Sequence, residues 1–130
     1  MNRYRDWLDQ AKANLEHAVH SVEAGDYAWA CFAAQQAAEM AAKGLHMKIG
    51  QIAWGHSVVD LFEALPAQVR PDKGFLEKMK ILDKYYIPTR YPNAHPRGPA
   101  HRYYTEKEAE EAIALAKEAL EYCERQSLAD

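Results

Sequence analysis

The sequence predicts an all-α protein, folded as one antiparallel, up-and-down bundle of four to five helices. Three observations lead to this prediction: apolar residues recur at helical spacing over most of the chain, glycine and proline separate these segments, and no segment shows the alternation of a strand. A chain of 130 residues can bury a sufficient hydrophobic core without disulfides or a structural metal. We therefore expect a single domain over residues 1–130.

The first two helices are expected at residues 3–24 and 27–49, with the turn Gly25-Asp26 between them. Gly25 suits the C-terminal end of the first helix, and Asp26 is a candidate N-cap of the second. The apolar stripe of the first helix consists of Tyr4, Leu8, Ala11, Leu15, Ala18, Val19 and Val22. The second helix is rich in alanine and apolar on more than one side, which is typical of a helix covered on more than one side. We expect it at the centre of the bundle and also at a homodimer interface.

A shorter helix is expected at residues 58–65. Ser57 and Asp60 have the spacing of a weak capping box at its start. His56, which directly precedes them, is interpreted as a capping or packing residue rather than a catalytic one.

The fourth and fifth helices flank the most unusual part of the chain. The fourth must end before Pro88, and its apolar stripe is Phe75, Met79, Leu82 and Tyr86. The fifth begins at a capping box formed by Thr105 and Glu108, and glutamates fill its first turns, where the helix dipole favours them.

Composition excludes several classes of protein. A net charge of −3 and a pI near 6.1 argue against a basic coat for long nucleic acid, although they do not exclude a local basic patch. Cys31 and Cys123 both fall on apolar helix faces, so we expect buried thiols rather than a disulfide, as in a reducing cytoplasm. The charged N-terminus does not read as a signal peptide, and no segment approaches the roughly 20 apolar residues of a membrane span. We expect a cytoplasmic location, no membrane contact and no cofactor.

Residues 84–105 interrupt this helical pattern with a rigid, cationic and aromatic segment. It contains four of the six prolines, five of the eight tyrosines and four lysine or arginine residues, but no aspartate or glutamate. Cations suit phosphates and tyrosine rings stack on bases, which is the combination that proteins use for single-stranded nucleotides. The predicted nucleotide- or RNA-binding residues, apart from the pair considered below, are Lys84, Tyr85, Tyr86, Tyr91, Arg97, His101, Arg102, Tyr103 and Tyr104.

Four segments, in this order, carry a resemblance to known proteins: AWACFAAQQAAEMAAKGLHMKIG, GHSVVDLFEAL, YYIPTRYPN and HRYYTEKEAEEAIALAKEAL. Together they resemble the HEPN family of small prokaryotic helical proteins, over about residues 4–125. The resemblance implies a HEPN-like antiparallel bundle that usually dimerises. It also implies a small nucleotidyltransferase as partner, in some members as toxin and antitoxin.

A subset of the family are metal-independent ribonucleases with an Arg-x(4–6)-His motif that two protomers bring together. Arg90 and His95 fit this spacing and are the candidate catalytic pair. Histidine can take the proton of a ribose 2′-hydroxyl, and a guanidinium stabilises charge on the phosphate. Two features count against catalysis: Tyr91 follows the arginine where ribonuclease members usually have a polar residue, and Pro92 lies in the spacer.

Other interpretations of the same loop stay open. In family toxins the partner can modify a tyrosine two residues after the motif histidine; Tyr103 has this relation to His101, but only three residues separate Arg97 from His101. No carboxylate or cysteine lies near His95 and His101, so no metal site is predicted. In a structural role, the arginine would pair with a carboxylate or cap a helix, and the tyrosines would pack between helix ends.

The favoured function is a nucleotide- or RNA-engaging module that works with a nucleotidyltransferase and has no catalytic activity of its own. The alternatives are a metal-independent endoribonuclease and a purely structural dimer.

Overall fold

The computed structural model describes residues 2–128 and confirms an all-α bundle, with no strand in that range. The α-helices are α1 (Tyr4–Glu23), α2 (Tyr27–Lys48), α3 (Val58–Glu63), α4 (Lys73–Asp83) and α5 (Glu106–Leu128). Three short 3₁₀ turns lie in the connections: η1 (Ala67–Val69), η2 (Pro92–Ala94) and η3 (Ala100–Tyr103).

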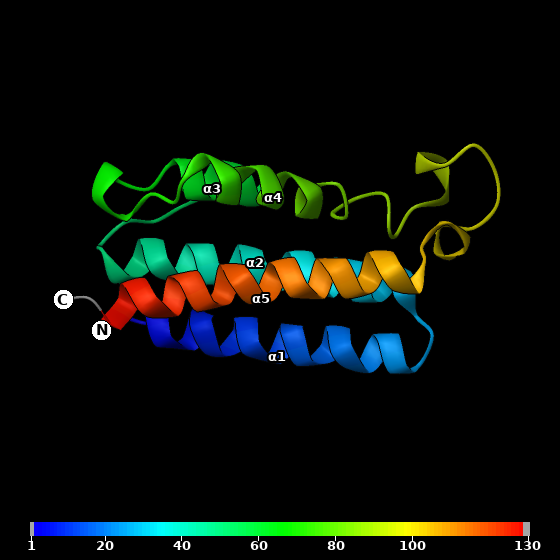
Figure 1. The fold of residues 1–130 in the computed structure, drawn as a ribbon, viewed down its shortest axis with the longest axis horizontal. Helices are drawn as coiled ribbons and strands as arrows, with labels where there is room; N and C mark the ends of the chain where they lie inside the picture. Colours follow the sequence, from blue (N-terminus) through cyan, green and yellow to red (C-terminus); the bar gives the residue numbers. More distant parts are fainter. Residues whose placement is uncertain (1, 129–130) are drawn as a thin grey trace.

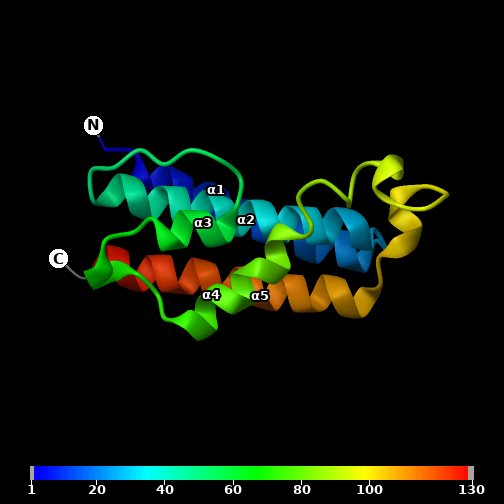
Figure 2. The same ribbon diagram turned by 90° about the horizontal axis from the view of Figure 1, so that it is seen from above.

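The three long helices form the body of the bundle. In Figure 1, α1, α2 and α5 lie side by side along the long axis, and α3 with α4 covers one side of them. Figure 2 shows α4 crossing above α5 and the loop that follows it projecting beyond one end of the bundle. Residues 84–105 therefore lie at the end where α1 turns into α2 and where α5 begins.

Helix α2 is the centre of this arrangement, as expected from its alanine content. It contacts every other α-helix, and the alanines from Ala28 to Ala42 are all buried. Gly44 marks the closest approach to α1: a Cβ at this position would lie 3.2 Å from the Cβ of Trp7 and 3.3 Å from the backbone oxygen of Tyr4. Small side chains on α2 thus fix the distance between the two helices.

The end of α1 and the turn into α2 agree with the prediction at Gly25 but differ from it at Asp26 and Val19. Gly25 has the expected positive φ of 78°, and its backbone N–H donates to Val22. Asp26 occupies the N-cap position of α2, but its side chain accepts no capping hydrogen bond. Val19, predicted on the apolar stripe of α1, is 40% exposed because the stripe is narrower at this end of the helix than helical spacing alone suggested.

Helix α3 begins with a cap that involves α4. The Ser57 hydroxyl accepts from the Asp60 N–H as predicted. In addition, the carboxylate of Asp83, the last residue of α4, accepts from the Ser57 hydroxyl at 2.9 Å and from the Val59 N–H at 3.1 Å, and it also accepts from the Val58 N–H. Helix α4 accordingly ends at Asp83 rather than continuing to Tyr86.

Helix α5 opens on the predicted capping box. The Thr105 hydroxyl accepts from the Glu108 N–H, and the Glu108 carboxylate accepts from the Thr105 N–H, both at 3.1 Å. The inward face of α5 ends at Cys123, which is buried and free, as is Cys31 on α2. Burial raises the pKa of the Cys31 thiol to about 12. Among the described residues, no helix is long and apolar enough to cross a membrane.

Candidate functional site

The loop of residues 84–105 is anchored to the bundle at both of its ends. Tyr85 lies in the core, where its ring meets the edge of Tyr104 at 6.1 Å, and burial raises the pKa of both hydroxyls. The buried Thr89 hydroxyl donates to the Tyr85 carbonyl at 2.7 Å. Ala100 is buried against the bundle at the other end. The loop therefore has a fixed base, and Tyr85 presents no ring surface to a ligand.

The Arg90 side chain packs against three aromatic rings. Its Nε and Nη2 donate to the Tyr86 carbonyl at 3.0 and 2.7 Å. Its guanidinium carbon lies 4.2 Å from the ring centre of Phe32, 4.9 Å from that of Tyr86 and 5.3 Å from that of Tyr91. These contacts orient the guanidinium and leave Nη1 without a hydrogen-bond partner in residues 2–128.

His95 lies in a second group, further along the loop. Its Nε2–H donates to the Pro88 carbonyl at 2.7 Å, since a carbonyl can only accept. Its ring stacks on Tyr103 at 4.3 Å and meets the edge of Tyr104 at 5.8 Å. The Tyr103 hydroxyl in turn donates to the Arg97 carbonyl. His95 thus holds the loop together, and no hydrogen bond joins it to Arg90 within the described part of the chain.

The remaining charged residues of the loop point into solvent. Lys84, Arg97, His101 and Arg102 are exposed, and none of them forms an ion pair within residues 2–128. Tyr91 and Tyr103 are partly exposed beside them. No group of three metal-ligating side chains occurs among the described residues, His95 and His101 included. The tip of the loop therefore offers uncompensated positive charge next to aromatic rings.

A further polar cluster, which the sequence analysis did not predict as a site, lies on α2 beside this loop. Glu39 is only 2% exposed, and its carboxylate accepts from Lys43 Nζ at 3.0 Å and from His56 Nδ1 at 3.3 Å. Gln35 and Gln36 donate to the same carboxylate at 3.3 and 3.2 Å. The His56 ring stacks on Tyr86 at 4.5 Å, which connects the cluster to Arg90. The sequence signals for it were a glutamate and a lysine four residues apart, and two glutamines just before them, in an alanine-rich helix.

A shallow groove extends this surface toward the start of α2. Trp29 is 51% exposed and meets Phe32 edge to face at 5.8 Å. Both line a hollow of about 240 Å³ between α1 and α2, which Asn14 and His17 close on the α1 side. The exposed tryptophan gives this face a large apolar contact area.

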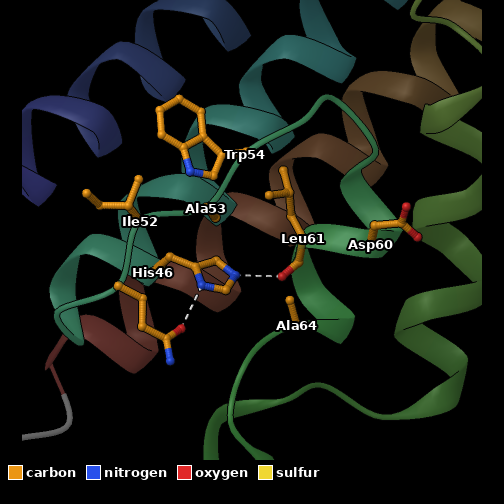
Figure 3. Close-up of a pocket in the computed structure, with 8 residues that line it drawn as sticks. His46, Ile52, Ala53, Trp54, Asp60, Leu61 and Ala64 are labelled. Atoms are coloured by element: carbon orange, nitrogen blue, oxygen red, sulfur yellow. Dashed lines mark hydrogen bonds between the residues drawn. The ribbon is translucent and has the colours of Figure 1, made fainter.

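A separate hollow of about 580 Å³ lies at the opposite end of α2, between α2 and α3. Figure 3 shows Ile52 and Trp54 at its rim and His46 at its base, with the His46 ring hydrogen-bonded to Leu61. The second ring nitrogen of His46 is bonded to Gln51, so the hollow contains no free histidine nitrogen. It includes none of the predicted site residues, and we do not assign the candidate site to it.

The fold and this surface define a class: a small helical bundle whose end loop presents cations and aromatic rings beside a polar cluster on its central helix. The family model of the HEPN domain matches residues 4–126. The chain belongs to the HEPN domain family.

Solved structures agree with this assignment. The chain is 61% identical to TT1696 from Thermus thermophilus, with 97% of this chain and 99% of that chain covered and a TM-score of 0.95. It is 38% identical to ST0689, an archaeal HEPN homologue, with 98% and 99% covered and a TM-score of 0.82. It is 37% identical to a HEPN domain protein from Thermotoga maritima, with 92% and 95% covered and a TM-score of 0.75. A comparison with curated proteins found no match.

Proposed function

We propose that this HEPN protein is a nucleotide- or RNA-engaging module that acts as a homodimer with a nucleotidyltransferase partner. The proposal rests on one feature of the loop: cations without acidic partners among residues 2–128 lie near exposed aromatic rings. Arg97 and Arg102 are exposed and lack acidic partners within residues 2–128, and the exposed ring of Tyr91 lies against Arg90. Phosphates and bases are the groups that such a surface binds together.

The contacts of Arg90 and His95 favour binding over cleavage by this pair. Both side chains are bonded to carbonyls of their own loop, through Tyr86 and Pro88 respectively. The two side chains lie in separate groups of the loop, and no hydrogen bond joins them within residues 2–128. The ribonuclease alternative would therefore need Arg90 and His95 of two protomers to come together, as the family resemblance implies.

The homodimer is supported by the surface of α2. Trp29 is 51% exposed and packs against Phe32 beside the groove between α1 and α2. A large exposed aromatic side chain of this kind commonly marks a protein contact. Size-exclusion chromatography with light scattering should give a dimer mass for the wild type and a smaller mass for Trp29→Ser.

The partner is supported by the family resemblance alone. A reading frame beside this gene with a Gly-Ser and paired-aspartate nucleotidyltransferase pattern would be the candidate. Co-expression with an affinity tag on one protein should recover a complex of defined stoichiometry. A candidate that never co-purifies would remove the partner from the proposal without affecting nucleotide binding.

The experiment that tests the central proposal measures binding and cleavage in parallel. Fluorescence anisotropy with a labelled single-stranded oligouridylate of about 12 nucleotides should show binding that weakens as salt rises. Arg97→Gln and Arg102→Gln should each weaken it several-fold, whereas Lys117→Gln, an exposed lysine on α5, should not. Absence of wild-type binding to RNA and to mononucleotides would refute the proposal.

Incubation of the protein with the same RNA in EDTA distinguishes the binding module from the ribonuclease alternative. We expect no cleavage product. Metal-independent cleavage that disappears in both Arg90→Ala and His95→Ala would replace the binding module with the ribonuclease.

A further inference from the structure

His56 is more firmly positioned than an exposed histidine at a helix start requires. Its Nδ1 lies 3.3 Å from both oxygens of Glu39, and the Gln35 amide donates to its backbone carbonyl at 2.9 Å. Its ring stacks on Tyr86 with an angle of 16° between the two planes. The side chain nevertheless remains 56% exposed. The protein thus holds the ring in one orientation and still presents it to solvent.

The contact with Glu39 determines which ring nitrogen accepts. The Glu39 carboxylate also accepts a hydrogen bond from Lys43 Nζ at 3.0 Å, so its oxygens act as acceptors. A carboxylate bonded at Nδ1 requires the proton to lie on Nδ1. In the neutral ring, Nε2 therefore carries a lone pair, and within residues 2–128 it has no hydrogen-bond partner. His56 offers one oriented acceptor to an incoming group.

This acceptor and a cation both contact the ring of Tyr86. The His56 ring centre and the Arg90 guanidinium carbon lie 4.5 and 4.9 Å from the same Tyr86 ring centre. The guanidinium retains Nη1 for a phosphate, and Tyr91 adds a half-exposed ring next to it. A nucleotide combines the groups that fit this arrangement: a phosphate, a flat base and sugar hydroxyls that donate hydrogen bonds.

We propose that His56 accepts a hydrogen bond from the ribose 2′-hydroxyl of a nucleotide whose phosphate Arg90 binds, so that this surface prefers RNA to DNA. The inference rests on the proposed nucleotide binding and extends it from the loop to His56, which precedes α3 and contacts Glu39 on α2. Glu39 is a positioning residue in this scheme, because it fixes the proton on Nδ1. The 2′-hydroxyl is the group that distinguishes the two nucleic acids at any one contact.

Packing or helix capping alone would predict a different pattern for His56. A packing histidine would bury its ring, and a capping histidine would direct a ring nitrogen to a helix N–H. Here Ser57 and Asp83 already satisfy the first N–H groups of α3. The cap therefore does not need the His56 side chain.

The test compares oligouridylate with oligodeoxyuridylate of the same length, which differ only in the 2′-hydroxyl. The wild type should bind the RNA about three- to tenfold more tightly, the range expected for one net hydrogen bond. His56→Phe keeps a ring on Tyr86 but removes the acceptor, so it should lower RNA affinity to the DNA value and leave DNA affinity unchanged. His20→Phe, at an exposed histidine on α1, should keep the preference.

The readouts separate failure of this inference from failure of the proposed function. Wild-type binding to both oligomers with an equal affinity, or with a preference that His56→Phe retains, overturns the role of His56 but leaves nucleotide binding intact. If His56→Phe weakens the binding of RNA and of DNA equally, the inference is also overturned, because the contact would then be to base or phosphate. Circular dichroism shows whether the variant is folded.

Ring ¹⁵N NMR provides an independent check that does not depend on binding. The neutral His56 ring should show a proton on Nδ1 in the wild type. Glu39→Gln should allow the proton to distribute between both nitrogens and should reduce the RNA preference without changing DNA affinity. A proton found on Nε2 in the wild type would overturn the inference.

Discussion

The carboxylate of Asp83 connects two helices, and its removal should have a measurable cost. It accepts from the Ser57 hydroxyl and from the N–H groups of Val58 and Val59, which are the first residues of α3. Asp83→Ala would leave these donors without their charged partner and remove the only link from α4 to this helix start that the described hydrogen bonds provide. The expected effect is therefore larger than that of an ordinary N-cap.

The magnitude follows from the contacts. Hydrogen bonds to a charged group contribute about 1.5–3 kcal/mol each, and loss of an N-cap costs about 1 kcal/mol. Water can reach the half-buried site and replace some of the lost hydrogen bonds. We therefore expect Asp83→Ala to lower the free energy of unfolding by about 2–4 kcal/mol. For a chain of 130 residues this corresponds to a fall in Tm of roughly 8–15 °C. Asp83→Asn keeps one acceptor oxygen and should lose about half as much.

Urea unfolding followed by circular dichroism measures this difference directly. Asp60→Ala is the matched control, because Asp60 lies in the first turn of α3 but its exposed carboxylate has no described hydrogen bond. It should change the free energy of unfolding by less than about 0.5 kcal/mol. If Asp83→Ala behaved like this control, the carboxylate would not stabilise the start of α3, and the reasoning from these hydrogen bonds would be wrong.

The remaining predictions concern Cys31 and two glycines. The desolvated Cys31, whose pKa is raised to about 12, should not react with a thiol reagent at pH 8 until the protein unfolds. Because the unfolded thiol loses its proton near pH 9 and the folded thiol does not, stability should fall as pH rises from about 9 toward 12, with a smaller fall in Cys31→Ala. Gly44→Ala should destabilise by about 1 kcal/mol, since the new Cβ meets atoms fixed to the α1 backbone and this outweighs the gain in helix propensity. Gly74→Ala, which meets only an Asp72 oxygen at 3.5 Å, should instead stabilise by up to about 1 kcal/mol, and equal signs for the two substitutions in urea unfolding would contradict this reasoning.

The features that sequence predicted well are those determined over a few residues. Helical spacing identified each long helix, and the Thr105–Glu108 capping box was found because both halves of it lie within one turn. The exposure of Val19 was missed because the width of an apolar stripe depends on how much of the helix its neighbours cover.

The candidate site was predictable only in part, because much of it is assembled by tertiary packing. The loop was identified by composition. The pairing of His56 with Glu39 joins residues 17 positions apart, and their contact depends on how α2 packs against the start of α3. The same holds for Phe32, which neither motif nor composition distinguished from other core aromatics before Arg90 was seen to lie over it.

The two anchors of the loop also determine how the protein can vary. Thr89 and Ala100 are fixed to the bundle, so the segment between them is a closed loop whose length is independent of the helix packing. The entropic cost of lengthening such a loop grows slowly, by about 0.6 kcal/mol for each doubling. Insertions beside Gly98, at the exposed tip, should therefore be tolerated with little loss of stability. This makes the tip a place where a tag, a fluorophore or a new recognition sequence can be added while the α2 surface stays unchanged.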